Sequence, residues 1–393
     1  MLSRHFFAYA VVASLLAVAG VFGLWAITRP PAPLSPELET PKLALEQASP
    51  ELRSRPLFFT PAALPLLQKR WGEWGPAFGA AAPLPGQLAT EFEATLPSPK
   101  AWRVLDRKWH FGAVLLAGDP AAFRPLLDHL RHAADWTLTR VDPASYLFER
   151  SPAKAWTVAG VPPVLEGYQS HSPKEQQFAR IQIAHRLMFL EEMPAAKGLL
   201  EEVLAREPKS REAWTEMAYW HGMAGQWAES CQAAERALAL SGSYRPAQTA
   251  KAQALEAEGR FDEALRLTRA LYAAAPANPQ ILLLHAKVTH GAHSFQEEIE
   301  VLQRLIGLLQ GRSQSVGFWQ LYLGQAYAAT GSALLAEEQF KAALQDTSLG
   351  ESDRDFATKA LDRLEMKADT VNTVSAAPTP SPSSLLDAPA YRP

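Results

Sequence analysis

Two histidines in the first half of the chain have a spacing that could contribute to a metal site. His129 and His132 stand three positions apart in a helical stretch, and Asp128 and Asp135 lie beside them. Zinc sites in proteins use three or four ligands at defined spacings. This group offers no third ligand at such a spacing, so a solvated helix face is the favoured interpretation and we predict no metal here.

The other histidines are expected to be packing or surface residues, and the single cysteine a packing residue. The remaining histidine group straddles an expected turn and consists of His285, His290 and His293. Cys231 lies where a small packing residue is expected, and a single cysteine excludes an intrachain disulfide. The G-x-S-x-G, H-E-x-x-H, Walker and G-x-G-x-x-G patterns are all missing from the sequence. We therefore expect a protein with no enzymatic activity, no cofactor and no metal.

The composition is that of a folded globular chain of two or three domains. Its 393 residues are 48% hydrophobic and 20% charged. A net charge of -3 provides no basic field to gather nucleic-acid phosphates. Nucleic acid is therefore not expected as a partner.

The N-terminal segment, residues 1–29, is predicted to be a membrane anchor. Residues 6–28 carry no charge, and as a helix they would reach about 33 Å, enough for a hydrocarbon core of about 30 Å. A cleaved signal peptide is the alternative, because Ala17, Val18 and Ala19 resemble a cleavage site. The anchor is favoured since the apolar run continues beyond that site. Either form sends the bulk of the chain across the membrane, so we expect a single-pass protein with a periplasmic body.

A proline-rich spacer and a small α/β domain are expected next. Residues 30–56 contain seven prolines, which favour an extended linker. Within residues 57–160, Ser98 and Pro99 begin a helix that ends at Trp109, and residues 111–116 form a buried strand. A second helix carries Pro125 in its first turn, and residues 136–141 and 146–150 form a hairpin. Residues 57–97 show no clear period and receive no assignment.

Part of this domain resembles a known family. Residues 95–150 are similar to the soluble extracytoplasmic segment of polytopic bacterial membrane proteins of the glycosyltransferase type. The residues that carry the resemblance are Trp102, Leu105, Asp106, Trp136, Asp142, Phe148 and Arg150. The many-span catalytic part of that family is missing from this sequence, so the resemblance implies an extracytoplasmic location and no sugar-transfer activity.

The second half of the chain repeats every 34 residues. The units are 177–210, 211–244, 245–278, 279–316 with four extra residues, and 317–350. Position 8 is small in every unit: Ala184, Ala218, Ala252, Ala286 and Gly324. Position 20 is Ala196, Ser230, Ala264, Glu298 and Ala336, and position 17 is large in four units: Met193, Trp227, Phe261 and Phe295. Position 15 is glycine in three: Gly225, Gly259 and Gly331. Small residues at positions 8 and 20 allow two antiparallel helices to approach closely, and glycine lets the chain turn.

This pattern resembles the tetratricopeptide repeat in its period and residue order. The resemblance implies an α-solenoid over residues 172–367, with a capping box at Ser172 and a capping helix at 352–367. Residues 368–393 are rich in proline and serine and are expected to be disordered. The predicted fold is thus mainly α: a transmembrane helix, a small α/β domain and a solenoid of helical hairpins.

The resemblance also implies a peptide-binding groove on the concave face, lined by positions 2, 5, 9, 12 and 13 of each first helix. The corresponding residues are Phe178, Ile181, His185, Met188, Phe189, Tyr219, Met223, Thr249 and Gln253. Their large side chains could instead belong to the core. The Lys, Asn and Arg of family members that clamp a C-terminal carboxylate are missing at matching positions of the first three units, so that binding mode is not implied.

The function expected from these features is a membrane-anchored scaffold for protein–protein interactions in the bacterial cell envelope. Its partners would be proteins or peptides. The alternative is an accessory component of the machinery that assembles envelope polysaccharides or glycans, with an α/β domain that contacts sugar.

Overall fold

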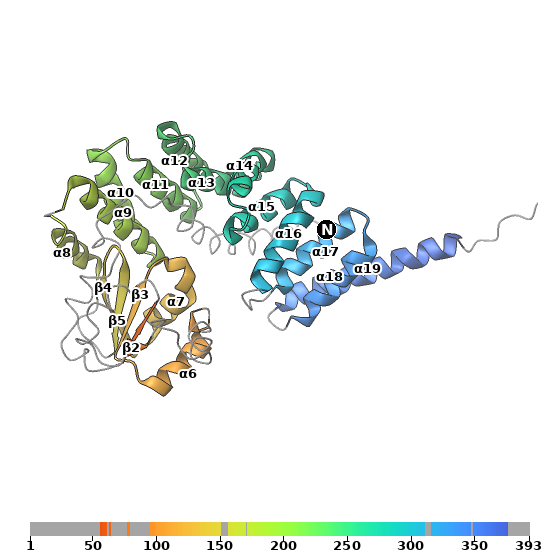
Figure 1. Cartoon of the computed structure of the whole chain (residues 1–393), viewed down its shortest axis with the longest axis horizontal. Helices are drawn as coiled ribbons and strands as arrows, with labels where there is room; N and C mark the ends of the chain where they lie inside the picture. Colours follow the sequence, from red (N-terminus) through yellow and green to blue (C-terminus); the bar gives the residue numbers. More distant parts are fainter. Residues whose placement is uncertain are drawn as a thin grey trace, which may run out of the picture. The chain divides into compact units, whose positions relative to one another are not determined.

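A computed structural model describes residues 56–60, 63, 77–78, 95–96, 98–150, 156–169, 171–310, 316–346 and 349–375 (Figure 1). The expected membrane anchor and most of the expected linker lie outside these residues. Within the described ranges, no helix is both long enough and apolar enough to cross a bilayer. The chain divides into two compact units, residues 1–284 and residues 285–393.

The first unit begins with a five-stranded mixed sheet of order β2-β1-β3-β5-β4. Strand β1 (Leu57–Phe59) pairs in parallel with β2 (Ala77–Phe78) and with β3 (Ala113–Ala117). Strand β5 (Ser145–Arg150) pairs antiparallel with β3 and with β4 (Trp136–Val141). The predicted hairpin is therefore present. Strands β1 and β2 fall in the segment left unassigned, because runs of two or three residues are too short to show a period.

Two predicted helices pack with this sheet. Helix α6 (Pro99–Trp109) begins as expected, since Ser98 Oγ accepts a hydrogen bond from Ala101 N at 3.2 Å. Helix α7 (Arg124–His132) carries Pro125 in its first turn, where a missing N–H costs nothing. The shorter connecting elements are η4 (Pro120–Phe123), η5 (Val158–Gly160) and α8 (Val161–Glu166).

Ten of the described helices form the five predicted hairpins, in the predicted register. Each hairpin consists of a first helix and a second helix of one 34-residue unit. The pairs are α9 (Pro173–Phe189) with α10 (Met193–Arg206), α11 (Arg211–Met223) with α12 (Trp227–Leu240), α13 (Arg245–Ala257) with α14 (Phe261–Ala274), α15 (Pro279–Gly291) with α16 (Phe295–Gln310), and α17 (Gly317–Ala329) with α18 (Ala333–Gln345). The division between the two units of the chain falls within α15.

The turn inside every hairpin uses the left-handed backbone region at position 15. The φ angles of Gly225, Gly259 and Gly331 are 72°, 74° and 83°. The same position in the other two units is Glu191, with φ 62°, and His293, with φ 55°. Glycine adopts this region without strain, whereas a residue with a Cβ does so at a cost. The turn geometry is thus common to all five units, although only three of them carry the glycine that reveals it in the sequence.

The last helix, α19 (Glu351–Ser375), extends further than predicted. The capping helix was expected to end at residue 367 and the disordered tail to begin at 368. Residues 368–375 contain no proline or glycine, and the first proline beyond the helix is Pro378, so no helix-breaking residue stops it earlier. Residues 376–393 lie outside the described residues.

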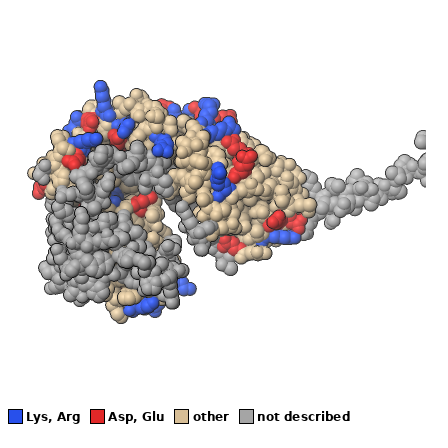
Figure 2. Space-filling view, viewed as in Figure 1, with Lys and Arg blue, Asp and Glu red and all other residues tan. Residues whose placement is uncertain are grey.

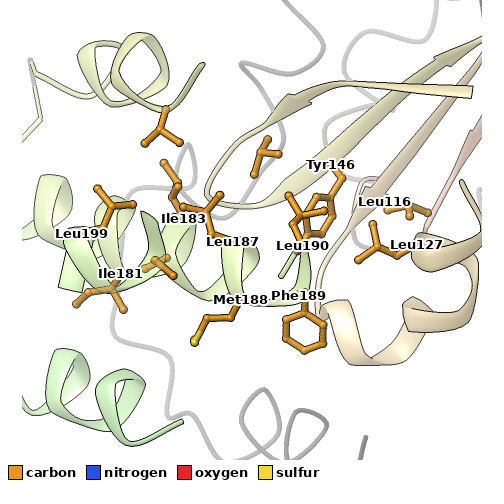
Figure 3. Packing of buried hydrophobic residues seen from close by; sticks show 14 of the residues in the cluster. Leu116, Leu127, Tyr146, Ile181, Ile183, Leu187, Met188, Phe189, Leu190 and Leu199 are labelled. Atoms are coloured by element: carbon orange, nitrogen blue, oxygen red, sulfur yellow. The ribbon is translucent and has the colours of Figure 1, made fainter. Parts of the chain in front are cut away.

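The sheet and the first two hairpins share one hydrophobic core (Figure 3). Leu116 and Tyr146 of the sheet and Leu127 of α7 belong to the same cluster of buried side chains as Leu187 and Leu190 at the end of α9. Because one core serves both parts, the α/β region closes the first end of the hairpin stack and is packed as part of it.

Arg186 anchors this joint from the middle of the shared core. Its side chain is 5% exposed. It donates from Nε to Pro143 O and from Nη2 to Gly118 O, both at 3.0 Å, and Tyr146 Oη donates to the backbone oxygen of Arg186 at 3.0 Å. Burial raises the pKa of the nearby Asp142 carboxyl, and the Arg186 charge opposes that rise. These bonds fix α9, the first helix of the stack, against the sheet.

Candidate protein-binding surface

Helices α9, α11 and α13 are the first helices of three successive units, and polar contacts link each to the next. His185 Nδ1 of α9 lies 3.0 Å from Glu216 Oε2 of α11, and both side chains are buried. Tyr219 Oη of α11 donates to Pro246 O of α13 at 3.2 Å. Burial raises the pKa of Tyr219 well above its usual value, with a smaller contribution from the Glu216 charge. The hydroxyl therefore remains protonated and available as a donor throughout the physiological range.

Buried polar atoms without a hydrogen-bond partner in the part of the chain that the structure describes occur on all three helices. Four of them are Gln182 Nε2, Glu216 Oε1, Thr249 Oγ1 and Gln253 Oε1. They occupy position 6 of units one and two and positions 5 and 9 of unit three. An unsatisfied buried donor or acceptor costs about 1–3 kcal/mol. Unsatisfied groups on three successive first helices therefore lower the stability of the free protein, and a bound chain that reached them would recover it.

Most of the residues predicted for the groove are buried in the structure. His185, Met188, Phe189, Tyr219, Thr249 and Gln253 are buried, as is Ile181, while Phe178 and Met223 are half-buried. Met188 and Phe189 lie in the core shared with the sheet (Figure 3). The Arg124 guanidinium of α7 stands over the Phe189 ring, 5.5 Å from its centre. Phe178 and Met223 are thus the members of the predicted set with the most accessible side chains, and the assignment of the set to binding stays a prediction.

Two residues of this surface were missed by the sequence reasoning. Gln182 and Glu216 stand at position 6, which was not among the positions considered. A signal was available, because unit three has Ala250 and unit four has Leu284 at the same position. A buried polar residue where sister units carry an apolar one indicates a site-specific role, since it costs stability unless it is paired.

The histidine groups also have definite surroundings. His132 Nδ1 lies 2.7 Å from Asp128 O, and burial, reinforced by the Arg103 charge, lowers the pKa of His129. In the fourth hairpin, His285 Nε2 lies 3.0 Å from Glu297 Oε1, and His290 Nδ1 lies 3.0 Å from Glu298 Oε1. Among the described residues, no three His, Cys, Asp or Glu side chains come together as a metal-binding group.

Cys231 is buried between helices, and burial, followed by the Glu235 charge, raises the pKa of its thiol. The thiol is therefore less ionised at neutral pH than an exposed one. A reactive nucleophile requires the opposite shift, so the surroundings favour a packing role for this side chain.

The fold defines the class of protein as an α-solenoid of 34-residue helical hairpins. The sequence profile described as tetratricopeptide repeat matches residues 245–288, which comprise the third hairpin and the beginning of the fourth. The chain carries tetratricopeptide repeats. The resemblance of residues 95–150 to glycosyltransferase-type membrane proteins is not shown by this match.

Several solved structures are similar to part of the chain. MamA residues 41-end from Desulfovibrio magneticus RS-1 is 20% identical, with a TM-score of 0.39, and the match covers 43% of this chain and 93% of that one. PilW, described as a widely conserved type IV pilus biogenesis factor, is 18% identical with a TM-score of 0.41. The match covers 51% of this chain and 90% of that one. TTC0263, a thermophilic tetratricopeptide protein of Thermus thermophilus, is 17% identical with a TM-score of 0.36. The match covers 47% of this chain and 98% of that one. No curated protein matches the chain.

Proposed function

We propose that this protein is a scaffold that binds an extended segment of a partner protein across α9, α11 and α13 and performs no chemistry itself. The proposal rests on the unpaired buried atoms that three successive first helices carry, on Gln182, Glu216, Thr249 and Gln253. Both donors and acceptors are needed to bond a peptide backbone, and these four side chains supply both kinds. Stacked helical repeats commonly present such extended surfaces to other proteins.

The length of the bound segment follows from the spacing of the helices. Packed helix axes lie about 8–10 Å apart, so the two steps from α9 to α13 span roughly 20 Å. An extended chain advances about 3.3 Å per residue. A segment of about six residues therefore crosses the three helices. Phe178 and Met223, which are half-buried, would contact its side chains.

The membrane tether is the second part of the proposal. It is supported by the uncharged residues 6–28, which are long enough as a helix to cross a bilayer. A body on the periplasmic side predicts that a C-terminal alkaline phosphatase fusion is active and that the protein fractionates with membranes. Activity restricted to a cytoplasmic reporter at the same junction would contradict this topology.

The binding proposal is tested by replacing unpaired polar groups with apolar ones of similar size. Gln182→Leu and Gln253→Leu each remove a buried group that has an unpaired atom, so the thermal midpoint is expected to stay level or rise. Recovery of the partner from native membranes is expected to fall at least tenfold, because the bonds to its backbone are lost. Gln232→Leu on α12, an exposed second-helix position, is the matched control and should leave recovery unchanged.

The thermal midpoint and the recovery of the partner together distinguish a binding role from a structural one. A structural role for Gln182 and Gln253 would lower stability and binding in parallel. Undiminished recovery of the partner by both variants, with stability retained, would overturn the assignment of these helices as the binding surface.

A further inference from the structure

Helix α6 presents a basic stripe to solvent. Its exposed side chains follow the spacing i, i+3, i+4, i+7, i+8, which places them on one side of a helix. They are Lys100, Arg103, Val104, Arg107 and Lys108. Val104, at the centre of the stripe, is 56% exposed. Trp102 and Leu105 are buried on the other side of the helix and pack in the core of the first unit. Burial of that side fixes the direction of the basic stripe.

Three of the four cations of this stripe have no counter-charge within the described part of the chain. Asp106, the only acidic residue of α6, is buried and paired with Arg150. No described carboxylate lies within ion-pair distance of Lys100, Arg103 or Arg107, although the chain as a whole carries a net charge of -3. Figure 2 shows Lys and Arg side chains at the end of the α/β region where α6 lies in Figure 1. A stripe with such an excess of positive charge is typical of a surface that meets an anionic partner.

We propose that the basic stripe of α6 contacts the anionic phosphate headgroups of a lipid bilayer. Lys and Arg near an anionic surface strengthen binding about fivefold each. An apolar side chain between them, as at Val104, can enter the boundary between headgroups and acyl chains. The stripe needs no pocket for this, because headgroups form a continuous charged plane.

The choice of a bilayer over other anionic partners rests on the membrane tether of the proposed function. Residues 29–55 connect the expected span to β1 and comprise 27 residues. A proline-rich chain of that length reaches about 80 Å at most. The α/β region therefore stays within that distance of the headgroups, and such tethering converts weak contacts into intramolecular ones with a raised effective concentration.

The test uses the full chain reconstituted into phosphatidylcholine vesicles with or without 30% phosphatidylglycerol. Val104→Cys in a Cys231→Ala background places one thiol in the stripe, and its reaction with a membrane-impermeant maleimide is timed. The rate is expected to be at least fivefold slower in the anionic vesicles and to recover in high salt. Val158→Cys, an exposed apolar position in η5 of the same unit, is the matched control and should react equally in both vesicles.

Removing positive charges from the stripe tests whether they cause the protection. Lys100→Gln, Arg103→Gln and Arg107→Gln together should abolish the difference between the two vesicles without slowing the control position. Equal rates for Val104→Cys in both vesicles would overturn the proposal. Protection by a soluble polyanion and not by anionic vesicles would assign the stripe to an acidic macromolecule and would equally overturn it. Alkaline carbonate extraction of the same vesicles reports the tether separately, so a missing anchor and a missing headgroup contact are distinguished.

Discussion

The contact between α17 and α18 at Gly324 permits a quantitative test of the repeat register. A Cβ added at Gly324 would lie 2.8 Å from both Cδ1 and Cε1 of Phe340 and 3.1 Å from its Cζ. Phe340 is 1% exposed, so its ring has no free space into which to move. Overpacking of this kind costs about 1–3 kcal/mol. Against this, alanine stabilises a helix interior by about 1 kcal/mol relative to glycine.

Gly307 in α16 provides the control that cancels the helix-propensity effect. A Cβ there would meet no atom within 4 Å. Gly307→Ala should therefore gain about 1 kcal/mol, and it should exceed Gly324→Ala in free energy of unfolding by about 1–3 kcal/mol. Urea unfolding followed by circular dichroism measures the difference. If both alanine variants gain equally, the crossing of α17 and α18 at Gly324 is not as close as the structure has it, and the register argument fails.

Three further changes test separate parts of the fold. Tyr146→Phe removes the hydroxyl that donates to Arg186 O and should lower the free energy of unfolding by about 1 kcal/mol, measured by urea titration; an unchanged midpoint would show that this bond does not hold the joint. His293→Gly relieves a left-handed residue with a Cβ and should raise stability by about 1 kcal/mol or less; a loss would contradict a strained turn. Burial raises the folded pKa of Glu298 above 4.5, partly opposed by its bond to His290. The folded state therefore holds the proton to higher pH than the unfolded state. The free energy of unfolding falls as pH rises from the unfolded-state pKa of Glu298 through its folded-state pKa. Glu298→Gln should flatten this part of the pH profile of thermal midpoints, and an unaltered slope would count against it.

The hairpin array could be predicted from the sequence because its defining contacts lie within one unit. Positions 8 and 20 of a unit meet each other twelve residues apart, so their small side chains recur at the repeat period. Ser230 illustrates this, since its Oγ donates to Ala218 O at 2.8 Å across the same hairpin. Local contacts of this kind leave a periodic signal that a single sequence contains.

The contacts that could not be predicted join residues far apart in the chain. Tyr146 and Arg186 are forty positions apart and belong to different parts of the fold, and neither carries a pattern that names the other. The burial of Phe189 also depends on a contact between distant segments, because Arg124 of α7 in the α/β region lies against the end of α9. Repeat position alone assigned Phe189 to a groove, whereas its surroundings depend on what precedes the array. Truncation of this buried ring to alanine would cost about 3–5 kcal/mol, so it is unsuitable as a test of binding.

Site-specific photo-cross-linking in living cells tests the central claim most directly. A photoreactive residue at Phe178, half-buried on the first helix α9, is compared with one at Gln232, exposed on the second helix α12. We expect that Phe178 captures one specific protein, that Gln182→Leu and Gln253→Leu abolish this capture, and that Gln232 captures nothing specific. Capture from Gln232 alone, or capture from Phe178 that survives both substitutions, would contradict the claim that the first helices bind the partner.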